Sequence, residues 1–493
     1  MGGAQGCGSL LDCIDNSWLD SLGYLKAALM HTSLSHKKGV VLGCGTAGMS
    51  VIRYLAGQGL PVGLSDVNPR ETLAPAVIHE LEQLGVACEF GAHTETFIAA
   101  YDFVVPSPGV PLDLPVITQA QERGQEIVGE LGLAAGEFTC PVLAVTGSNG
   151  KTTVTSLLGD ILKQDGKKVF VGGNIGRPLL ECFSGEKPYE AAVLELSSFQ
   201  LELAGSFTPD VALVLNITPD HLNRHHTIEQ YMAAKMNITV NQTHGDALIV
   251  GSDDPLLVKV KGGQGVDTFS FGFGDGATAR VGEMEVELLW GQQRSPAVEI
   301  YALENTRLLS FVNRLNAAAA ILAARRVGIS QERIQRGLEL FQPPLHRMTE
   351  VAVIDGVQYI NDSKATNLGA LQAALNGCTK PVVLIACGRD KGSDFTELQE
   401  VVSQKVRHLI VMGEAAGKLH QALGHLVPAT QVYSMEEAVT TGGRMAKDGD
   451  MVLLAPGCAS FDMFSSYEER GEVFMACVRK MAQKSKKEQV SSC

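Results

Sequence analysis

The stretch PVLAVTGSNGKTTVTSLLGDILKQDG, residues 141–166, passes from an apolar run through a glycine loop into a helix-forming segment. The apolar run predicts a buried strand, and the helix is expected to begin at Lys151. Backbone N–H groups in such a loop point at phosphate oxygens, and the helix N-terminus adds partial positive charge. In the phosphate-loop pattern G-x-x-x-x-G-K-[ST], Val145 takes the first glycine position, and the first glycine is Gly147. We therefore predict a shortened phosphate loop, in which Lys151 neutralises charge and Thr152 holds Mg²⁺.

An earlier stretch, GVVLGCGTAGMS at residues 39–50, has the same order of strand, glycine turn and helix. Gly43, Gly45 and Gly48 form G-x-G-x-x-G, and Asp66 follows Gly48 by 18 residues at the end of another strand-like run. This is the dinucleotide-binding fingerprint as usually written. Taken alone, the stretch predicts a diphosphate site at a helix N-terminus and leaves an NAD-dependent oxidoreductase open.

The alternation of strands and helices restarts near residue 140 and again near residue 350, which predicts three successive α/β units with parallel sheets. A chain of 493 residues holds about three domains at roughly 100–200 residues each. The last twelve residues, AQKSKKEQVSSC, are expected to fray. The predicted divisions are a leader of unknown role at 1–38, a first domain at 39–130, a central domain at 131–343 and a C-terminal domain at 344–493.

Composition argues against several classes of function. The net charge of −14 and the pI of about 5.4 disfavour sequence-independent nucleic-acid binding, which needs a basic face. The eleven cysteines include no C-x-x-C, so neither a disulfide framework nor a zinc site is expected. No uncharged apolar stretch reaches the ~18–20 residues of a membrane span, and the N-terminus has no secretory-signal pattern. We therefore expect a protein of a reducing compartment without membrane insertion.

Polar residues follow several predicted strands, at the edge where an α/β sheet binds ligands. Glu195 in LELSSFQLE is placed to act as a metal carboxylate, and TPDHLNRHH supplies Asp220 and His221. Lys235 in YMAAKMN lies on a predicted helix, where spacing alone favours a solvent-exposed lysine. The last unit contributes three polar stretches that could be substrate sites or ordinary turns: NDSKATN (361–367), CGRDKGSDF (387–395) and APGCASFDMFSSYEERG (455–471).

Taken together, these stretches resemble the Mur ligase family, and the resemblance covers about residues 39–480. The phosphate loop is shared by all Mur ligases, whereas NDSKATN, D-K-G-x-D-F and the CASFD…E-x-R-G ending indicate the branch that adds D-glutamate. The resemblance implies an N-terminal Rossmann-like UDP-binding domain, a central P-loop ATPase-like domain and a C-terminal Rossmann-like domain. It also implies an ATP-dependent ligase that joins D-glutamate to UDP-N-acetylmuramoyl-L-alanine through an acyl phosphate. That reaction belongs to cytoplasmic peptidoglycan synthesis, and hence to cell-wall biogenesis, cell shape and cell division.

The resemblance further implies roles for individual residues. The ATP-binding set is Gly147, Ser148, Asn149, Gly150, Lys151, Thr152, Thr153, Asn313, Asn316, Arg347, Asp362 and Lys364. The set for the UDP substrate is Gly45, Thr46, Asp66, Ser107 and Asn174, and the set for D-glutamate is Thr366, Lys391, Ser460 and Phe461. Two Mg²⁺ ions would be held by Thr152, Glu195, His221 and Lys235, with Lys235 as a carbamate formed from CO₂. Catalytic roles fall to Lys151, His221 and Lys235, the partners are the three substrates alone, and a monomer is expected.

The chain departs from the family pattern at four places. Asn223 stands where an aspartate is common, and HRMTE in place of H-R-x-E leaves the register of Glu350 open. Val312 stands where the family has a His before Asn313, and Tyr467 replaces a Phe beside the predicted D-glutamate site. Three other functions stay open: a sister ligase that adds another amino acid, an oxidoreductase that uses the first domain, and a non-catalytic nucleotide-binding scaffold. The oxidoreductase leaves VTGSNGKTT and Lys235 unexplained, so the resemblance favours a UDP-sugar as the source of the diphosphate at the first glycine turn.

Overall fold

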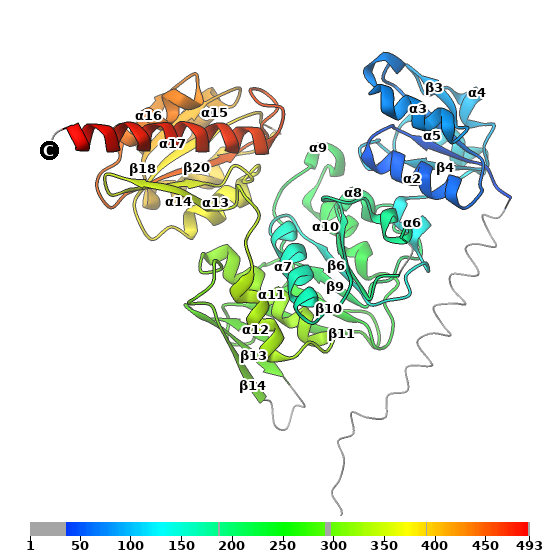
Figure 1. The fold of residues 1–493 in the computed structure, drawn as a ribbon, viewed down its shortest axis with the longest axis horizontal. Helices are drawn as coiled ribbons and strands as arrows, with labels where there is room; N and C mark the ends of the chain where they lie inside the picture. Colours follow the sequence, from blue (N-terminus) through cyan, green and yellow to red (C-terminus); the bar gives the residue numbers. More distant parts are fainter. Residues whose placement is uncertain (1–35, 186–187, 291–296, 391, 492–493) are drawn as a thin grey trace, which may run out of the picture. The chain divides into compact units, whose positions relative to one another are not determined.

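The computed structural model describes residues 36–185, 188–290, 297–390 and 392–491 (Figure 1), so most of the predicted leader lies outside the described residues. By their packing the residues form two compact units. The first comprises the described residues up to Val142 with Lys168–Ala192 and Phe199–Pro209, and the second comprises Leu143–Lys167, Val193–Ser198 and Asp210–Cys493. Within the described ranges, no helix is long and apolar enough to cross a membrane. The domain boundaries expected from the sequence stay a prediction.

A five-stranded sheet with the order β3-β2-β1-β4-β5 forms the core of the first unit. β1 (Gly39–Leu42) lies in the middle and pairs in parallel with β2 (Val62–Asp66) and β4 (Phe103–Pro106), and all three strands are buried along their whole length. Such continuous burial is typical of parallel sheets. The outer strands are β3 (Ala87–Phe90) and β5 (Glu126–Ile127), and the helices are α2 (Thr46–Gly57), α3 (Pro75–Gln83), α4 (Glu95–Ile98), α5 (Pro115–Glu122) and α6 (Glu130–Ala134).

The second sheet has nine strands in the order β14-β13-β12-β11-β10-β9-β6-β8-β7. The strands predicted for the central domain are present as β6 (Val142–Thr146), β7 (Val169–Gly173), β8 (Ala191–Glu195) and β9 (Val211–Val214). Beyond β9 the parallel part continues and ends in an antiparallel hairpin. These further strands are β10 (Ala247–Gly251), β11 (Asp267–Gly272), β12 (Ala279–Val281), β13 (Glu285–Trp290) and β14 (Ala297–Ala302).

Helix α11 (Phe311–Arg326) has nine consecutive buried residues, from Asn316 to Ala324. Small alanine side chains allow this helix to lie close to α7 (Lys151–Gln164), which packs against it. Asn316 of α11 lies beside Gly150, the residue that precedes α7 in the phosphate loop. The remaining helices of this region are α8 (Ser198–Leu201), α9 (Leu222–His225), α10 (Ile228–Met236) and α12 (Gln331–Leu340).

The third sheet, within the second unit, has the order β15-β16-β20-β17-β18-β19. Helices α13 (Leu368–Asn376), α14 (Gln399–Lys405) and α15 (Ala416–Leu423) contribute to one apolar cluster of this domain. Helices α16 (Met435–Met445) and α17 (Tyr467–Ser491) contribute to a separate cluster, and Figure 1 shows α17 lying across the sheet. The strands are β15 (Thr349–Ile354), β16 (Val357–Asn361), β17 (Val382–Cys387), β18 (Val406–Met412), β19 (Ala429–Gln431) and β20 (Met451–Gly457).

Three α/β sheets in sequence confirm the predicted fold class. The expectation of parallel sheets is wrong for the second and third sheets, which also contain antiparallel pairs where only a few residues of chain separate neighbouring strands. The expectation that the last twelve residues fray is wrong as far as Ser491, because α17 continues to that residue. The physical reason is composition, since Ala, Gln, Lys and Glu in this segment are all good helix formers.

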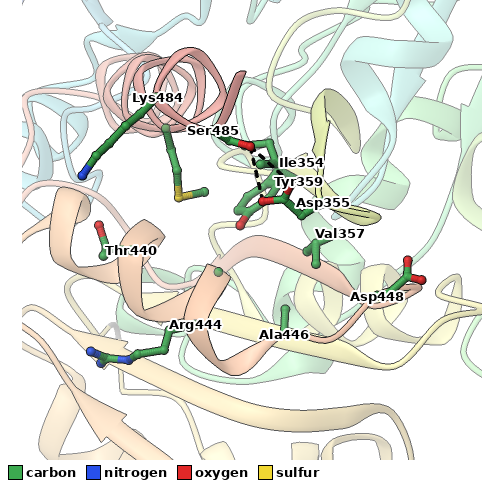
Figure 2. A pocket seen from close by; sticks show the side chains of 12 residues that line it. Ile354, Asp355, Val357, Tyr359, Thr440, Arg444, Ala446, Asp448, Lys484 and Ser485 are labelled. Carbon is green, nitrogen blue, oxygen red and sulfur yellow. Dashed lines mark hydrogen bonds between the residues drawn. The ribbon is translucent and has the colours of Figure 1, made fainter. Parts of the chain in front are cut away.

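A cavity of about 320 Å³ lies on the α16–α17 side of the third sheet (Figure 2). Tyr359 and Val357 contribute to its buried floor, whereas Arg444 and Lys484 are exposed at its rim. None of the residues predicted to bind substrate or nucleotide lines this cavity, so those residues have to be sought elsewhere in the fold.

Candidate active site

The phosphate loop follows β6 as predicted, and α7 begins at Lys151. Gly147 and Gly150 have positive φ values of 143° and 89°, which favour glycine. A Cβ atom at Gly150 would also lie 2.4 Å from Oδ1 of Asn316 on α11, so a side chain has no room there. The turn is held by Asn216, whose Oδ1 accepts from the Asn149 N–H at 2.8 Å and whose Nδ2 donates to the Asn149 carbonyl at 3.0 Å.

Two lysines point into this loop. Lys151 Nζ donates to the Gly147 carbonyl at 2.8 Å and to the Ser148 carbonyl at 3.0 Å, and Lys235 Nζ of α10 donates to the same Gly147 oxygen at 2.8 Å. Lys235 is only 1% exposed, and its Nζ lies 4.5 Å from the centroid of the Tyr231 ring. The sequence placed Lys235 on a helix correctly, but its spacing favoured exposure, which the fold contradicts because α10 turns that face inward.

Burial lowers the pKa of both lysines, and a neighbouring positive charge adds to the effect at each. The pKa of Lys235 is well below 10.5, first because the ammonium is desolvated and then because Lys151 is positively charged; Asp220 and Glu195 oppose the shift. Burial also lowers the pKa of Lys151, with Arg347 adding to the effect and the same two carboxylates opposing it. A lysine with a lowered pKa is available as a neutral, nucleophilic amine.

Besides Lys235 on α10, the predicted metal ligands are Thr152, Glu195 and His221, which come from three further elements. Glu195 ends β8 and is 2% exposed, and Thr152 is the second residue of α7. His221 precedes α9 with a φ of 56°, and its Nε2 lies 3.8 Å from Oδ2 of Asp220. Asp220 also accepts a hydrogen bond from Asn367 Nδ2 at 3.0 Å. Among the described residues, no group of three or more His, Cys, Asp or Glu is arranged to hold a metal ion, so a metal here needs other oxygen donors.

One pocket gathers eight of the twelve residues predicted to bind ATP: Asn149, Gly150, Thr153, Asn313, Asn316, Arg347, Asp362 and Lys364. Val312, the departure from the family pattern, lines the same pocket. The sequence analysis did not single out the remaining lining residues, which are apolar or small apart from Ser310, whose hydroxyl accepts from the Asn313 N–H at the start of α11. A capping serine before an apolar helix was the available signal for Ser310. The other lining residues are Met348, Ala365, Ala370, Ala373 and Ala374.

The charges in this pocket are perturbed by burial. The pKa of Asp362 is raised to about 6 by desolvation, which the Met348 N–H and Arg347 partly oppose; that N–H donates to Asp362 Oδ1 at 3.1 Å. Burial lowers the pKa of Lys364 to about 8, with Arg347 contributing. The Lys364 ammonium lies 3.7 Å from the centroid of the Tyr467 ring. Cations with little solvent around them suit an anionic ligand such as a polyphosphate.

The residues predicted to bind D-glutamate follow the carboxyl ends of β16, β17 and β20. Thr366 is half-buried, Ser460 is 2% exposed, and Phe461 is an exposed aromatic side chain at 64%. Lys391 lies outside the described residues. Backbone hydrogen bonds join these segments, since the Gly457 N–H donates to the Ala365 carbonyl at 2.8 Å.

The residues predicted for the UDP substrate lie in the first unit. Position 48 has room only for glycine, because a Cβ atom there would lie 2.0 Å from the Gly43 carbonyl oxygen. That oxygen accepts from Ser107 Oγ at 3.0 Å, and Asp66 Oδ2 accepts from the N–H of Cys44 at 2.5 Å. Gly45 and Thr46 form the start of α2, and Asn174 is exposed after β7. Asp66 therefore shapes the glycine turn at the N-terminus of α2.

Family comparisons identify three consecutive domains. Residues 37–129 match the MurD-like N-terminal domain of Mur ligases, residues 145–324 the Mur ligase middle domain, and residues 346–458 the Mur ligase glutamate ligase domain. The UDP-N-acetylmuramoylalanine–D-glutamate ligase of Desulfotalea psychrophila is 43% identical over 440 residues, which cover 89% of this chain and 95% of that protein. The ligase of the same name from Acidobacterium capsulatum is 40% identical over 444 residues, covering 90% and 96%.

Solved structures agree in fold. The UDP-N-acetylmuramate–alanine ligase of Thermotoga maritima matches with a TM-score of 0.56 and 19% identity, over 90% of this chain and 100% of that one. A pseudomurein peptide ligase type C from Methanothermus fervidus matches with a TM-score of 0.57, 19% identity and the same coverage. The chain belongs to the Mur ligase family.

Proposed function

We propose that this chain is an ATP-dependent ligase that joins D-glutamate to UDP-N-acetylmuramoyl-L-alanine in peptidoglycan precursor synthesis. The observation that carries the proposal is the pocket in which eight predicted ATP-binding residues come together beside the phosphate loop. The relatives named D-glutamate ligases, which are about 40% identical over most of this chain, support the choice of substrates. A cytoplasmic monomer remains our expectation.

The first step activates a carboxylate, which is otherwise a poor electrophile. A carboxylate oxygen of the UDP substrate attacks the γ-phosphorus of ATP, the bond from that phosphorus to its bridging oxygen breaks, and ADP leaves. Positioning and charge neutralisation are the main tasks of a protein in phosphoryl transfer. Lys151 at the N-terminus of α7 would neutralise the phosphates, with Arg347 and Lys364 contributing from the pocket.

Modification of Lys235 would reconcile its position with a metal site. A buried ammonium would repel a cation, whereas a carbamate supplies the oxygen ligands that Mg²⁺ prefers. The lowered pKa supports this, because the neutral Nζ can attack the carbon of CO₂, form an N–C bond and release a proton. With Thr152, Glu195 and His221 it would hold two Mg²⁺ ions, which when bound offset repulsion between the reacting carboxylate and phosphate.

The second step forms the amide. The neutral amine of D-glutamate attacks the acyl carbon and forms the N–C bond. The nitrogen then loses one proton, and the tetrahedral intermediate expels inorganic phosphate as the C–O bond breaks. Thr366, Lys391, Ser460 and Phe461 would hold the amino acid. The UDP part of the other substrate would be held by Gly45, Thr46, Asp66, Ser107 and Asn174.

Phosphate release tests the proposal directly. The full chain is incubated with ATP, Mg²⁺ and UDP-N-acetylmuramoyl-L-alanine, with D-glutamate, L-alanine, a diamino acid or no amino acid. Release that depends on D-glutamate and on the UDP substrate is the expected result. Release with another amino acid would identify a sister ligase, and ATP binding without any release would contradict the ligase function.

Replacing Lys235 with Ala tests the carbamate. We expect Lys235→Ala to lose nearly all activity, because the site loses the anion that would bind metal, and bicarbonate or a short carboxylic acid to restore part of it. The matched control is Lys163→Ala, which removes an exposed lysine of α7 that pairs with Asp160 on the surface. A fully active Lys235→Ala protein would remove the carbamate from the mechanism.

A further inference from the structure

Arg470 on α17 is completely buried, and its guanidinium holds three separate segments of the third domain. Nε donates to Ser363 Oγ at 3.0 Å, and Nη2 donates to the Ser363 carbonyl at 2.8 Å. Nη1 donates to the carbonyls of Cys458 at 3.1 Å and Cys387 at 3.4 Å. One side chain therefore connects the segments that follow β16, β17 and β20.

Each residue that Arg470 contacts comes a few positions before a residue predicted to bind D-glutamate. Thr366 follows Ser363 by three residues, Lys391 follows Cys387 by four, and Ser460 follows Cys458 by two. The last two segments also pair directly, since Arg389 and Ala459 exchange backbone hydrogen bonds at 2.8 and 3.1 Å. Arg470 thus contacts the segments that lead to Thr366 and to Ser460, the two buried or half-buried residues of the predicted amino-acid site that the structure describes.

The hydrogen-bonding partners of Arg470 are all uncharged. Within the described part of the chain, no Asp or Glu forms an ion pair with it, and its partners are carbonyl oxygens and a hydroxyl. A guanidinium stays protonated even when buried, and an isolated buried charge is costly. An anion bound at the segments that follow β16, β17 and β20 would offset the buried positive charge of Arg470.

We propose that Arg470 is a positioning residue that makes the site selective for an amino acid with a second carboxylate. This inference rests on the proposed function. D-glutamate carries one more negative charge than D-glutamine, which has nearly the same shape. The positive potential from Arg470 favours D-glutamate, while its hydrogen bonds fix the segments on which either amino acid would lie.

Two variants separate charge from geometry. Arg470→Gln removes the charge, and Arg470→Lys keeps the charge but loses the planar fork of donors. Phosphate release is measured with D-glutamate and with D-glutamine as the varied substrate, and KM for ATP is measured in parallel. The control is Arg444→Gln, an exposed arginine of the same domain at the cavity in Figure 2, which should leave every value unchanged.

For Arg470→Gln we expect the kcat/KM ratio of D-glutamate to D-glutamine to fall about tenfold, with KM for ATP changed less than about threefold. For Arg470→Lys we expect the ratio to be kept while KM rises for both amino acids. An equal loss with both amino acids in Arg470→Gln would overturn the inference. If that variant does not fold, a lost ratio in folded Arg470→Lys overturns it. Wild-type protein inactive with D-glutamate would instead refute the proposed function.

Discussion

Glu130 offers a test of the first unit, because its carboxyl is buried with little compensation. It is the first residue of α6, is 5% exposed and accepts a hydrogen bond from Gln200 Nε2 at 3.4 Å. Burial raises its pKa from 4.5 to about 7, although Gln200 and the N–H groups of Leu180 and Leu179 oppose the shift. The perturbation is Glu130→Gln, which keeps the shape and removes the titration.

The magnitude follows from proton linkage. The folded chain keeps the Glu130 proton at pH values where the unfolded chain has lost it, so the free energy of unfolding decreases as pH rises from about 4.5 through about 7. At 1.36 kcal/mol per pKa unit the full effect is about 3 kcal/mol, of which about 2.5 kcal/mol falls between about pH 5 and about pH 8. The wild type should lose that amount relative to Glu130→Gln.

The assay is urea unfolding followed by circular dichroism for both proteins at the two pH values. The other titrating groups are common to both proteins and cancel in the difference, so the pH-dependent part reports Glu130. Glu122→Gln is the control, since Glu122 is an exposed carboxylate on α5 of the same unit. Parallel pH profiles for wild type and Glu130→Gln would refute the reasoning, because they would mean that the carboxyl ionises as it does in the unfolded chain.

Two further outcomes are expected at the nucleotide pocket. Gly150→Ala should weaken ATP binding at least about tenfold in a calorimetric titration, because Gly150 has a positive φ and a side chain there would clash with Asn316. The control is Gly166→Ala, which should retain ATP affinity, because φ is also positive at Gly166 but the space around it is open. ATP affinity should fall several-fold as pH rises through about 8, because Lys364 loses its positive charge. Lys364→Arg should make ATP affinity less dependent on pH, and an equally steep dependence in that variant would contradict the role given to Lys364.

The sequence predicted those features that depend on local pattern. Lys151 begins α7 and Asp66 ends β2 because a strand, a glycine turn and a helix follow one another directly in the chain. The burial of Lys235 was not predictable from spacing, because it depends on how α10 packs against a loop 88 residues away. Arg470 belonged to a recognised motif, but its contact with Ser363 spans 107 residues and only the fold reveals it.

Strands β10 to β14 were not anticipated. β10 is an apolar, wholly buried strand, whereas β11 to β14 carry polar and charged residues among the apolar ones. The hairpin of β13 and β14 at the end of the order leaves Val298 and Ile300 more than half exposed. A clean alternation of inward apolar and outward polar residues is therefore absent there, and periodicity is a weak signal. The pairing of each strand with its neighbour, which no local pattern encodes, determines this part of the sheet.

The single carbonyl oxygen of Gly147 that accepts from both Lys151 and Lys235 has a consequence for the resting enzyme. An unmodified lysine and its carbamate both keep an N–H on the same nitrogen, so the bond from Lys235 to Gly147 can survive a reversal of charge. Lys151, by contrast, has to leave that oxygen to meet a phosphate. If the proposed carbamate forms, dissolved CO₂ would set the fraction of molecules competent for catalysis while Lys235 keeps its hydrogen bond to the loop.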